Sequence, residues 1–489
     1  MSSPVAPLKP YQVWLVVIVA SIGFLFDTYE LLMFPVIARP AIMELAQLPE
    51  QSAEIPGWIG RINWLTALSG GIFGLMGGLF IDRFGRKKIM VASIMLYSFS
   101  PVFAAFSTSL WMLIVFRCTT FIGVCVEFVA AITWLSELFT EKRSRQLAVG
   151  WTQAFASVGG LLVTAVAGYV ITHLDQFPAL PMGGEQGTKT AWRYTLLTGM
   201  IPGLMIALML PFVPESRIWA ERKRNGTLIR PRLSELFTKD LRRTTLVTAC
   251  LSACAYGAAF GALQLTPPQI VPGLPEFAAP RAEIMKEGKQ LEAKLENKDQ
   301  LPPEEVKDLT KQVGANKGKL KELQKQTQQK GSEVQLWQEL GGLLGRIALA
   351  ILVVVIIKHR LLLRIFQFPG LIIFPVTYML FFRDQPELFP MGIALAGFCT
   401  VAQLSYFGEF LPKVFPTHLR GTGGSFATNV GGRMIGTSAG FVTTSVVAPM
   451  MAGDNNFAKV SMAAGIVGAS VCVIGLIASC FLPEPKAEE

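Results

Sequence analysis

Ionisable side chains interrupt two long apolar runs early in the chain. Asp27 and Glu30 stand three residues apart in the first run, and Arg117 and Glu127 stand ten residues apart in a later one. Residues three apart share a face of a helix. If the two helices run in opposite directions, the two acids lie near the depth of Arg117 and can pair with it. Because a charge inside a membrane helix is costly, these residues are predicted to form a functional site. The alternative is an ion-pair network that only holds two helices together.

Other polar side chains in apolar runs are weaker candidates. Arg433 needs a carbonyl, a carboxylate or a substrate anion as its partner, because an unpaired guanidinium inside a membrane is unfavourable. The candidates for substrate contact share a polar side chain within an apolar run; they are Tyr29, Gln153, Tyr256, Gln264, Gln403, Tyr406 and Asn429. Each could equally form a hydrogen bond between helices or pack in the interior.

The elements that position these residues are predicted to be membrane helices. Of the 489 residues, 51% are hydrophobic and only 16% are charged, and the mean hydropathy is +0.45. This composition is typical of a protein with many membrane spans and excludes soluble enzymes, nucleic-acid-binding modules and secreted disulfide scaffolds. Membrane topology explains the net charge of +10, so we expect no nucleic-acid partner. The seven cysteines lie in apolar runs without a C-x-x-C pair, and we expect neither disulfides nor a metal.

Twelve apolar runs predict twelve membrane-spanning helices. The first run is too long for the core of a signal peptide, so we expect it to stay as a helix. The runs are 13–37, 58–81, 88–107, 110–136, 147–172, 193–213, 243–267, 338–357, 361–382, 388–412, 422–449 and 459–482.

Basic residues collect in the loops after the even-numbered runs, which is the pattern of cytoplasmic loops. Both termini are therefore predicted to be cytoplasmic. Residues 281–333, in the loop after the seventh run, break the pattern with twelve basic and ten acidic side chains. Apolar residues recur there every three or four positions on both sides of Pro302 and Pro303, which predicts an external helical hairpin whose second arm continues into the eighth run. The alternative is a solvated or partly disordered tether.

One loop carries a specific signature. Residues 78–88 read Gly-Leu-Phe-Ile-Asp-Arg-Phe-Gly-Arg-Lys-Lys. The glycines allow two helices to approach closely, Asp82 can pair with an arginine at the helix end, and the basic cluster keeps the loop cytoplasmic. The segment resembles in full the G-x-x-x-D-R-x-G-R-K-K signature of the major facilitator superfamily. The resemblance extends over most of the chain, through Trp192-Arg193, Pro214 to Arg217, Arg420 to Gly423, and Asn429 to Arg433.

The resemblance implies an all-α membrane protein of two six-helix bundles. The bundles would be residues 1–213 and 242–489, joined by a cytoplasmic loop at 214–241, with 269–336 as an extracytoplasmic charged helical insertion between the seventh and eighth spans. The resemblance also implies a cytoplasmic gate, built from Gly78, Asp82, Arg83, Gly85, Arg86, Glu137, Arg143, Glu215, Arg217, Glu409, Arg420 and Arg433. The second half departs from the family in two places. Lys413 stands where a glutamate is usual, and the second-half copy of the signature keeps Lys358-His359-Arg360 but lacks the acid that Asp82 supplies in the first copy.

The resemblance further implies a function. In proton symporters of the superfamily, two acids in the first span, with an arginine and an acid ten residues apart in the fourth, form the proton-coupling site. Asp27, Glu30, Arg117 and Glu127 match these positions. We therefore expect a transporter in the bacterial inner membrane that moves a small organic anion with protons by alternating access. No enzymatic activity and no cofactor are expected, since the chain has no phosphate-binding glycine loop.

Two alternatives remain open. The first is a proton-coupled sugar or phosphate transporter, because the Asp27-Thr28-Tyr29-Glu30 element also resembles the phosphate carriers. The second is a sensor or assembly scaffold that does not transport, in which the 281–333 hairpin docks an extracytoplasmic protein. The buried carboxylates argue against a scaffold, which has no need of them.

Overall fold

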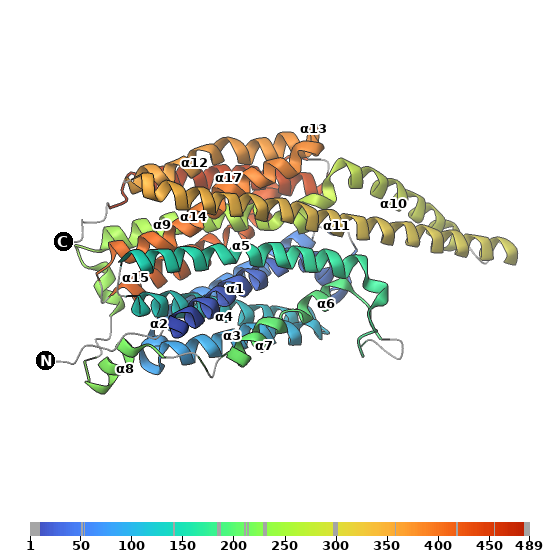
Figure 1. The fold of residues 1–489 in the computed structure, drawn as a ribbon. Coiled ribbons are helices and arrows are strands. Elements are labelled where there is room, and N and C mark those ends of the chain that lie inside the picture. Colours follow the sequence, from blue (N-terminus) through green and yellow to red (C-terminus); the bar gives the residue numbers. More distant parts are fainter. Residues whose placement is uncertain are drawn as a thin grey trace.

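The computed structural model is helical in its described part, apart from an isolated bridge between Leu180 and Thr188. The structure describes residues 10–49, 52, 54–139, 142–182, 187–209, 212, 215–227, 232–296, 302–356, 358–416, 419–453 and 455–483. The helices lie side by side in an elongated bundle, and a pair of helices, α10 (Pro275–Glu296) and α11 (Pro303–Val355), extends from one end of it (Figure 1). We call this the hairpin end.

The first half of the chain packs around one apolar core. α1 (Pro10–Leu45) lies along α5 (Lys142–Thr172), while α4 (Leu110–Leu138) contacts both α2 (Glu54–Phe84) and α3 (Arg86–Ala105). Side chains of α1 and α4 make up most of this core. The two helices that carry the four predicted charges are therefore neighbours.

Shorter helices complete the first half. α6 (Ala191–Leu197) and α7 (Met200–Met209) follow each other closely, and both contact α3. α8 (Arg217–Arg224) comes next, and its first turn is capped by the Ser216 hydroxyl, which accepts a hydrogen bond from the Trp219 amide at 3.2 Å. α8 lies at the end of the bundle opposite the hairpin (Figure 1).

The second half is less regular. Its helices are α9 (Arg242–Gly261), α11, α12 (His359–Pro375), α13 (Phe382–Asp384), α14 (Phe389–Val414), α15 (Arg420–Ser425), α16 (Ala439–Phe441) and α17 (Asn456–Ser479). Wide π-type turns interrupt them at η5 (Thr266–Ile270), η8 (Val376–Phe381), η11 (Phe426–Gly436) and η12 (Val442–Val447). Prolines stand within η5 and just before η8, where a missing amide proton disfavours regular helix. Single three-ten turns are η1 (Leu174–Gln176), η3 (Leu233–Phe237), η4 (Leu263–Leu265), η6 (Val271–Gly273), η9 (Pro386–Leu388) and η13 (Ala448–Met450).

α11 is much longer than a membrane requires. Its 53 residues span about 80 Å, whereas a bilayer core is about 30 Å thick. Its first part packs against α10 through Leu291, Leu309 and Val313, and its last part joins the core of the second half through Leu349. One continuous helix therefore connects the charged hairpin to the interior of the bundle.

Nine helices in the described ranges are long and apolar enough to cross a membrane. They cover nine of the predicted runs. The runs 58–81, 193–213 and 422–449 fall on α2, on α6 with α7, and on α15 to η13, so their described residues are helical except for turns at 198–199 and 437–438.

Close backbone contact places α1 against α5. A Cβ atom at Gly159 would lie 1.8 Å from the Leu25 carbonyl oxygen, so only glycine fits here. Leu25 precedes Asp27 by two residues and Glu30 by five, so this contact sets how closely α5 approaches that part of α1.

Candidate functional site

A cavity of about 110 Å³ lies between the two halves. α1, α4 and α5 line it on one side, and α9, α11, α14 and η11 line it on the other. Four charged residues face it: Asp27, Glu339, Arg346 and Arg433. We call it the central cavity.

Asp27 and Arg433 form a buried ion pair that joins the halves. Arg433 Nη2 lies 3.5 Å from Asp27 Oδ2, and Arg433 Nη1 donates to Asn429 Oδ1 at 3.2 Å and to the Val124 carbonyl at 3.3 Å. Its guanidinium also lies 4.8 Å from the centre of the Phe128 ring. Asp27 belongs to α1 and Arg433 to η11, so this contact joins segments 406 residues apart.

Arg433 does not lie where we predicted it. We placed it at the cytoplasmic gate, whereas it contacts α4 at Val124. Glu137, which belongs to the gate cluster, is thirteen residues further along α4, or about 20 Å. The arginine turns inward because Asp27 and Asn429 offer it acceptors there.

Glu30 and Arg117 form a second buried pair. Arg117 Nη1 donates to the Glu30 backbone carbonyl at 3.3 Å. Arg117 also lies 4.9 Å from the centre of the Phe34 ring. Among the described residues, no group donates a hydrogen bond to the Glu30 carboxylate. Arg117 therefore contacts the backbone of Glu30 and not its carboxylate in the described structure, while Asp27 pairs with Arg433.

Glu127 completes the buried cluster. Its side chain is buried, and its Oε1 would lie 2.5 Å from a Cβ at Gly23, so it packs directly on α1. Its charge interacts with those of Asp27 and Arg433. Within the described part of the chain, its carboxylate has no hydrogen-bond donor. The structure therefore brings the four predicted residues together around α1 and α4.

Sequence reasoning missed two charges in the central cavity. Glu339 and Arg346 stand seven residues apart on α11, and both face the cavity. Gln338 Nε2 donates to Glu339 Oε1 at 2.9 Å, and a Cβ at Gly160 of α5 would lie 2.2 Å from Glu339 Oε2. Both residues fall inside the predicted run 338–357, so a search for charges within apolar runs would have found them.

The predicted substrate contacts divide into two groups. Tyr256 and Gln264 line the central cavity, and Asn429 holds Arg433. By contrast, the Tyr29 hydroxyl lies 2.5 Å from Thr198 Oγ1, next to α6, and Gln403 donates to a carbonyl of its own helix.

Tyr406 is a further candidate that does not line the central cavity in the described structure. The Tyr406 ring stacks on Phe410, with 5.0 Å between centroids. The described residues that line the central cavity do not include Tyr29, Gln403 or Tyr406. The side chain of Gln153 lies outside the described residues.

A separate polar cluster lies at the end opposite the hairpin. Gly85, with φ of 105°, turns the chain between α2 and α3. Arg86 then reaches Glu137 with contacts of 2.7, 3.0 and 3.2 Å, and the Ser216 hydroxyl donates to Glu137 at 2.5 Å. Glu215 accepts from the Arg86 amide at 3.0 Å. The cluster ties α3, α4 and the segment before α8 together, all within the first half.

The other predicted gate residues contribute less. Arg83 is exposed and lies 5.4 Å from the Phe84 ring, and Gly78 has open space beside it. The remaining five have side chains outside the described residues; they are Asp82, Arg143, Arg217, Glu409 and Arg420.

The family model of the Major Facilitator Superfamily matches residues 12–282, and the chain belongs to this superfamily. The niacin transporter NiaP of Acinetobacter baylyi is 26% identical over 198 residues, which cover 40% of each chain. The 4-hydroxybenzoate transporter PcaK of Pseudomonas aeruginosa is 30% identical over 233 residues, 47% of this chain and 46% of the relative. The chain thus spans about half the length, or less, of these relatives.

Solved structures show the same fold over the whole chain. The xylose transporter XylE from E. coli, in a partially occluded inward-open conformation, superimposes with a TM-score of 0.65. The alignment covers 98% of this chain and 100% of that one at 15% sequence identity. The likeness therefore establishes the fold.

Proposed function

We propose that this chain is a secondary active transporter, a proton-coupled symporter of a small organic anion that works by alternating access. The observation that carries the proposal is the buried Asp27–Arg433 pair, at 3.5 Å, between the two halves beside the central cavity. Protonation of Asp27 neutralises its carboxylate and so removes its ion pair with Arg433. The guanidinium then binds a carboxylate of the substrate instead. Proton binding and anion binding are thereby coupled at one arginine.

The surroundings of the pair support an anionic substrate with an apolar body. A second arginine, Arg346, lines the central cavity together with the Glu339 carboxylate. Phe128, Tyr256 and Phe260 supply aromatic surface for a ring or an unsaturated chain. The relatives named for niacin, 4-hydroxybenzoate and cis,cis-muconate point to the same class of compound.

Glu30, Arg117 and Glu127 complete the proposed proton-coupling site. They are buried next to Asp27, and the carboxylates of Glu30 and Glu127 have no described hydrogen-bond donor. A protonated carboxyl needs fewer donors than a carboxylate, so these groups are suited to hold a proton while the substrate crosses. Release of substrate returns Arg433 to Asp27 and expels the proton.

The proposed topology has twelve spans in two six-helix bundles, 1–213 and 242–489, in the bacterial inner membrane. Both termini, and the loop 214–241 between the bundles, would be cytoplasmic. The cluster of Arg86, Glu137 and Glu215 would then stabilise the cytoplasmic side. The α10–α11 hairpin would be an extracytoplasmic insertion.

The test is uptake into proteoliposomes under an imposed inward proton gradient. The panel is nicotinate, 4-hydroxybenzoate and cis,cis-muconate, with xylose and phosphate as probes of the alternative substrates. We expect one of the three organic anions to accumulate above its external concentration, and only while the gradient lasts. Accumulation of xylose or phosphate alone, or uptake that ignores the gradient, would contradict the proposal.

A further inference from the structure

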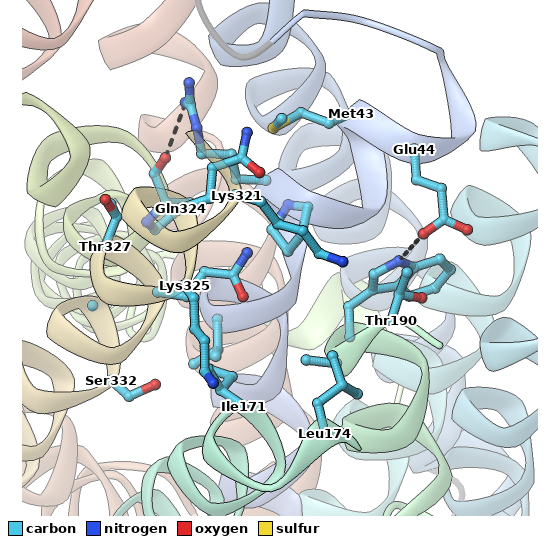
Figure 2. Close-up of a pocket in the computed structure, with 18 of the residues that line it drawn as sticks. Met43, Glu44, Ile171, Leu174, Thr190, Lys321, Gln324, Lys325, Thr327 and Ser332 are labelled. Carbon is cyan, nitrogen blue, oxygen red and sulfur yellow. Dashed lines mark hydrogen bonds between the residues drawn. The ribbon is translucent and has the colours of Figure 1, made fainter. Parts of the chain in front are cut away.

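A second and larger cavity, of about 770 Å³, lies at the hairpin end. The last turns of α1, the segment from α5 to α6, the proline-rich turns η5 and η6, and the charged part of α11 line it. Figure 2 shows Lys321, Gln324 and Lys325 on one wall, with Met43 and Glu44 of α1 on another. We call it the vestibule.

Two lysines of α11 give the vestibule positive charge. Lys321 and Lys325 stand one helical turn apart and both line it (Figure 2). Neither forms an ion pair with an acidic side chain in the described part of the chain. Elsewhere on the same helix, Lys317, Lys319 and Lys330 each pair with a glutamate. Among the described residues, the two vestibule lysines therefore differ from Lys317, Lys319 and Lys330 in facing the vestibule without an acidic partner.

The acids of the vestibule neutralise these lysines little. Glu44 is already engaged, since it accepts from Trp192 Nε1 at 2.7 Å and pairs with Arg193 at 2.7 Å. Asp175 and Glu322 are exposed, as Lys321 is, and solvent screens their charges. Lys189, also exposed there, adds a further positive charge. The vestibule interior is thus positive on its α11 wall.

Apolar side chains of α1 and η5 also line the vestibule. Pro35 and Pro40 of α1 face Pro267 and Pro268 of η5, and Trp192 adds an aromatic surface. Rigid apolar walls beside a pair of ammonium groups suit a carboxylate carried on a ring or an unsaturated chain.

A line of cavities leads from the vestibule to the central cavity. A small cavity between them shares Pro35 and Pro268 with the vestibule, and shares Leu31, Phe260 and Gln264 with the central cavity. Arg39 Nη1 of α1 donates to the Pro268 carbonyl at 3.2 Å at this junction. That contact joins the two halves where the vestibule meets the small cavity.

We propose that the vestibule is an outer binding site, where Lys321 and Lys325 capture the carboxylate of an organic anion before the Arg39–Pro268 contact opens to the central cavity. The identity of the ligand rests on the proposed function. The insertion thus contributes to substrate capture through the part of α11 that continues into the membrane.

The test is equilibrium binding of radiolabelled nicotinate, 4-hydroxybenzoate and cis,cis-muconate to the full-length protein in nanodiscs, with uptake measured in parallel. The variant is Lys321→Gln with Lys325→Gln. The matched control is Lys307→Gln with Lys311→Gln, which removes two exposed charges at the same spacing further out on α11. Arg433→Gln reports on the central cavity separately.

We expect the vestibule variant to weaken binding roughly fivefold and to raise KM for uptake with little change in kcat, since two charges at about 6 Å from an anion contribute this much in a wet cavity. The control should match the wild type, and Arg433→Gln should stop uptake but keep the lysine-dependent binding. If all three probes bind equally well to the wild type and to the variant with both lysines replaced, the vestibule is not a binding site for them, even when uptake is observed. Lysine-dependent binding without any uptake leaves the vestibule in place and refutes the proposed transport.

Discussion

Replacing Arg86 by glutamine should destabilise the protein by about 2–3 kcal/mol. Its guanidinium makes contacts of 2.7, 3.0 and 3.2 Å with Glu137, and the two side chains are only 7% and 15% exposed. A hydrogen bond to a charged group contributes roughly 1.5–3 kcal/mol to stability. The Glu137 carboxylate, which loses its arginine partner in the variant, adds a desolvation cost. The Ser216 hydroxyl continues to donate to Glu137 in the variant and limits the loss.

Thermal unfolding of the purified protein in detergent, followed by tryptophan fluorescence, measures this loss. Arg83→Gln is the matched control, because it removes the same charge three residues earlier from an exposed side chain, where changes are usually within about 0.5 kcal/mol. Arg86→Lys should fall between the two, since lysine keeps the charge but not the forked contact. Equal Tm values for Arg86→Gln and Arg83→Gln would refute the reasoning.

Three further predictions concern the interior. Gly159→Ala should prevent correct folding, because its Cβ would lie 1.8 Å from a carbonyl oxygen of α1. Gly168→Ala on the same helix has open space around its Cβ and should leave yield and Tm unchanged. Size-exclusion profiles of the two purified variants test the difference in folding. A double-mutant cycle of Asp27→Asn and Arg433→Gln, read from unfolding in detergent, should give a coupling energy of at least about 1 kcal/mol, and additive effects would show that the two side chains do not interact. Arg346→Gln should raise the Kd for the transported anion about tenfold, and an unchanged Kd would remove this arginine from the substrate site.

Hydropathy and the cost of buried charge account for what the sequence predicts well. A membrane helix needs about twenty apolar residues, so the run 110–136 anticipates α4 (Leu110–Leu138) closely. Asp27, Glu30 and Glu127 stand out for the same reason, because charges are rare in such runs. The structure gathers all three around α1 and α4.

Contacts between distant segments account for what was missed. Spacing along one helix relates Asp27 to Glu30, but it gives no information on an arginine 406 residues away. Arg433 was therefore predicted at the gate, although its partner lies at the central cavity. Glu339 was overlooked because it follows directly on a charged segment and resembles its continuation. The sequence pattern also does not predict the π-type turns, because each adds a residue to a helical turn and departs from the α-helical repeat.

The account depends most directly on Asp27 as the residue that couples protons to substrate. Proteoliposomes loaded with a pH-sensitive dye report proton entry when the transported anion is added outside, and preloaded vesicles report exchange of labelled for unlabelled anion. Asp27→Asn should abolish substrate-driven acidification while exchange continues. Acidification at the wild-type rate in Asp27→Asn would contradict the account.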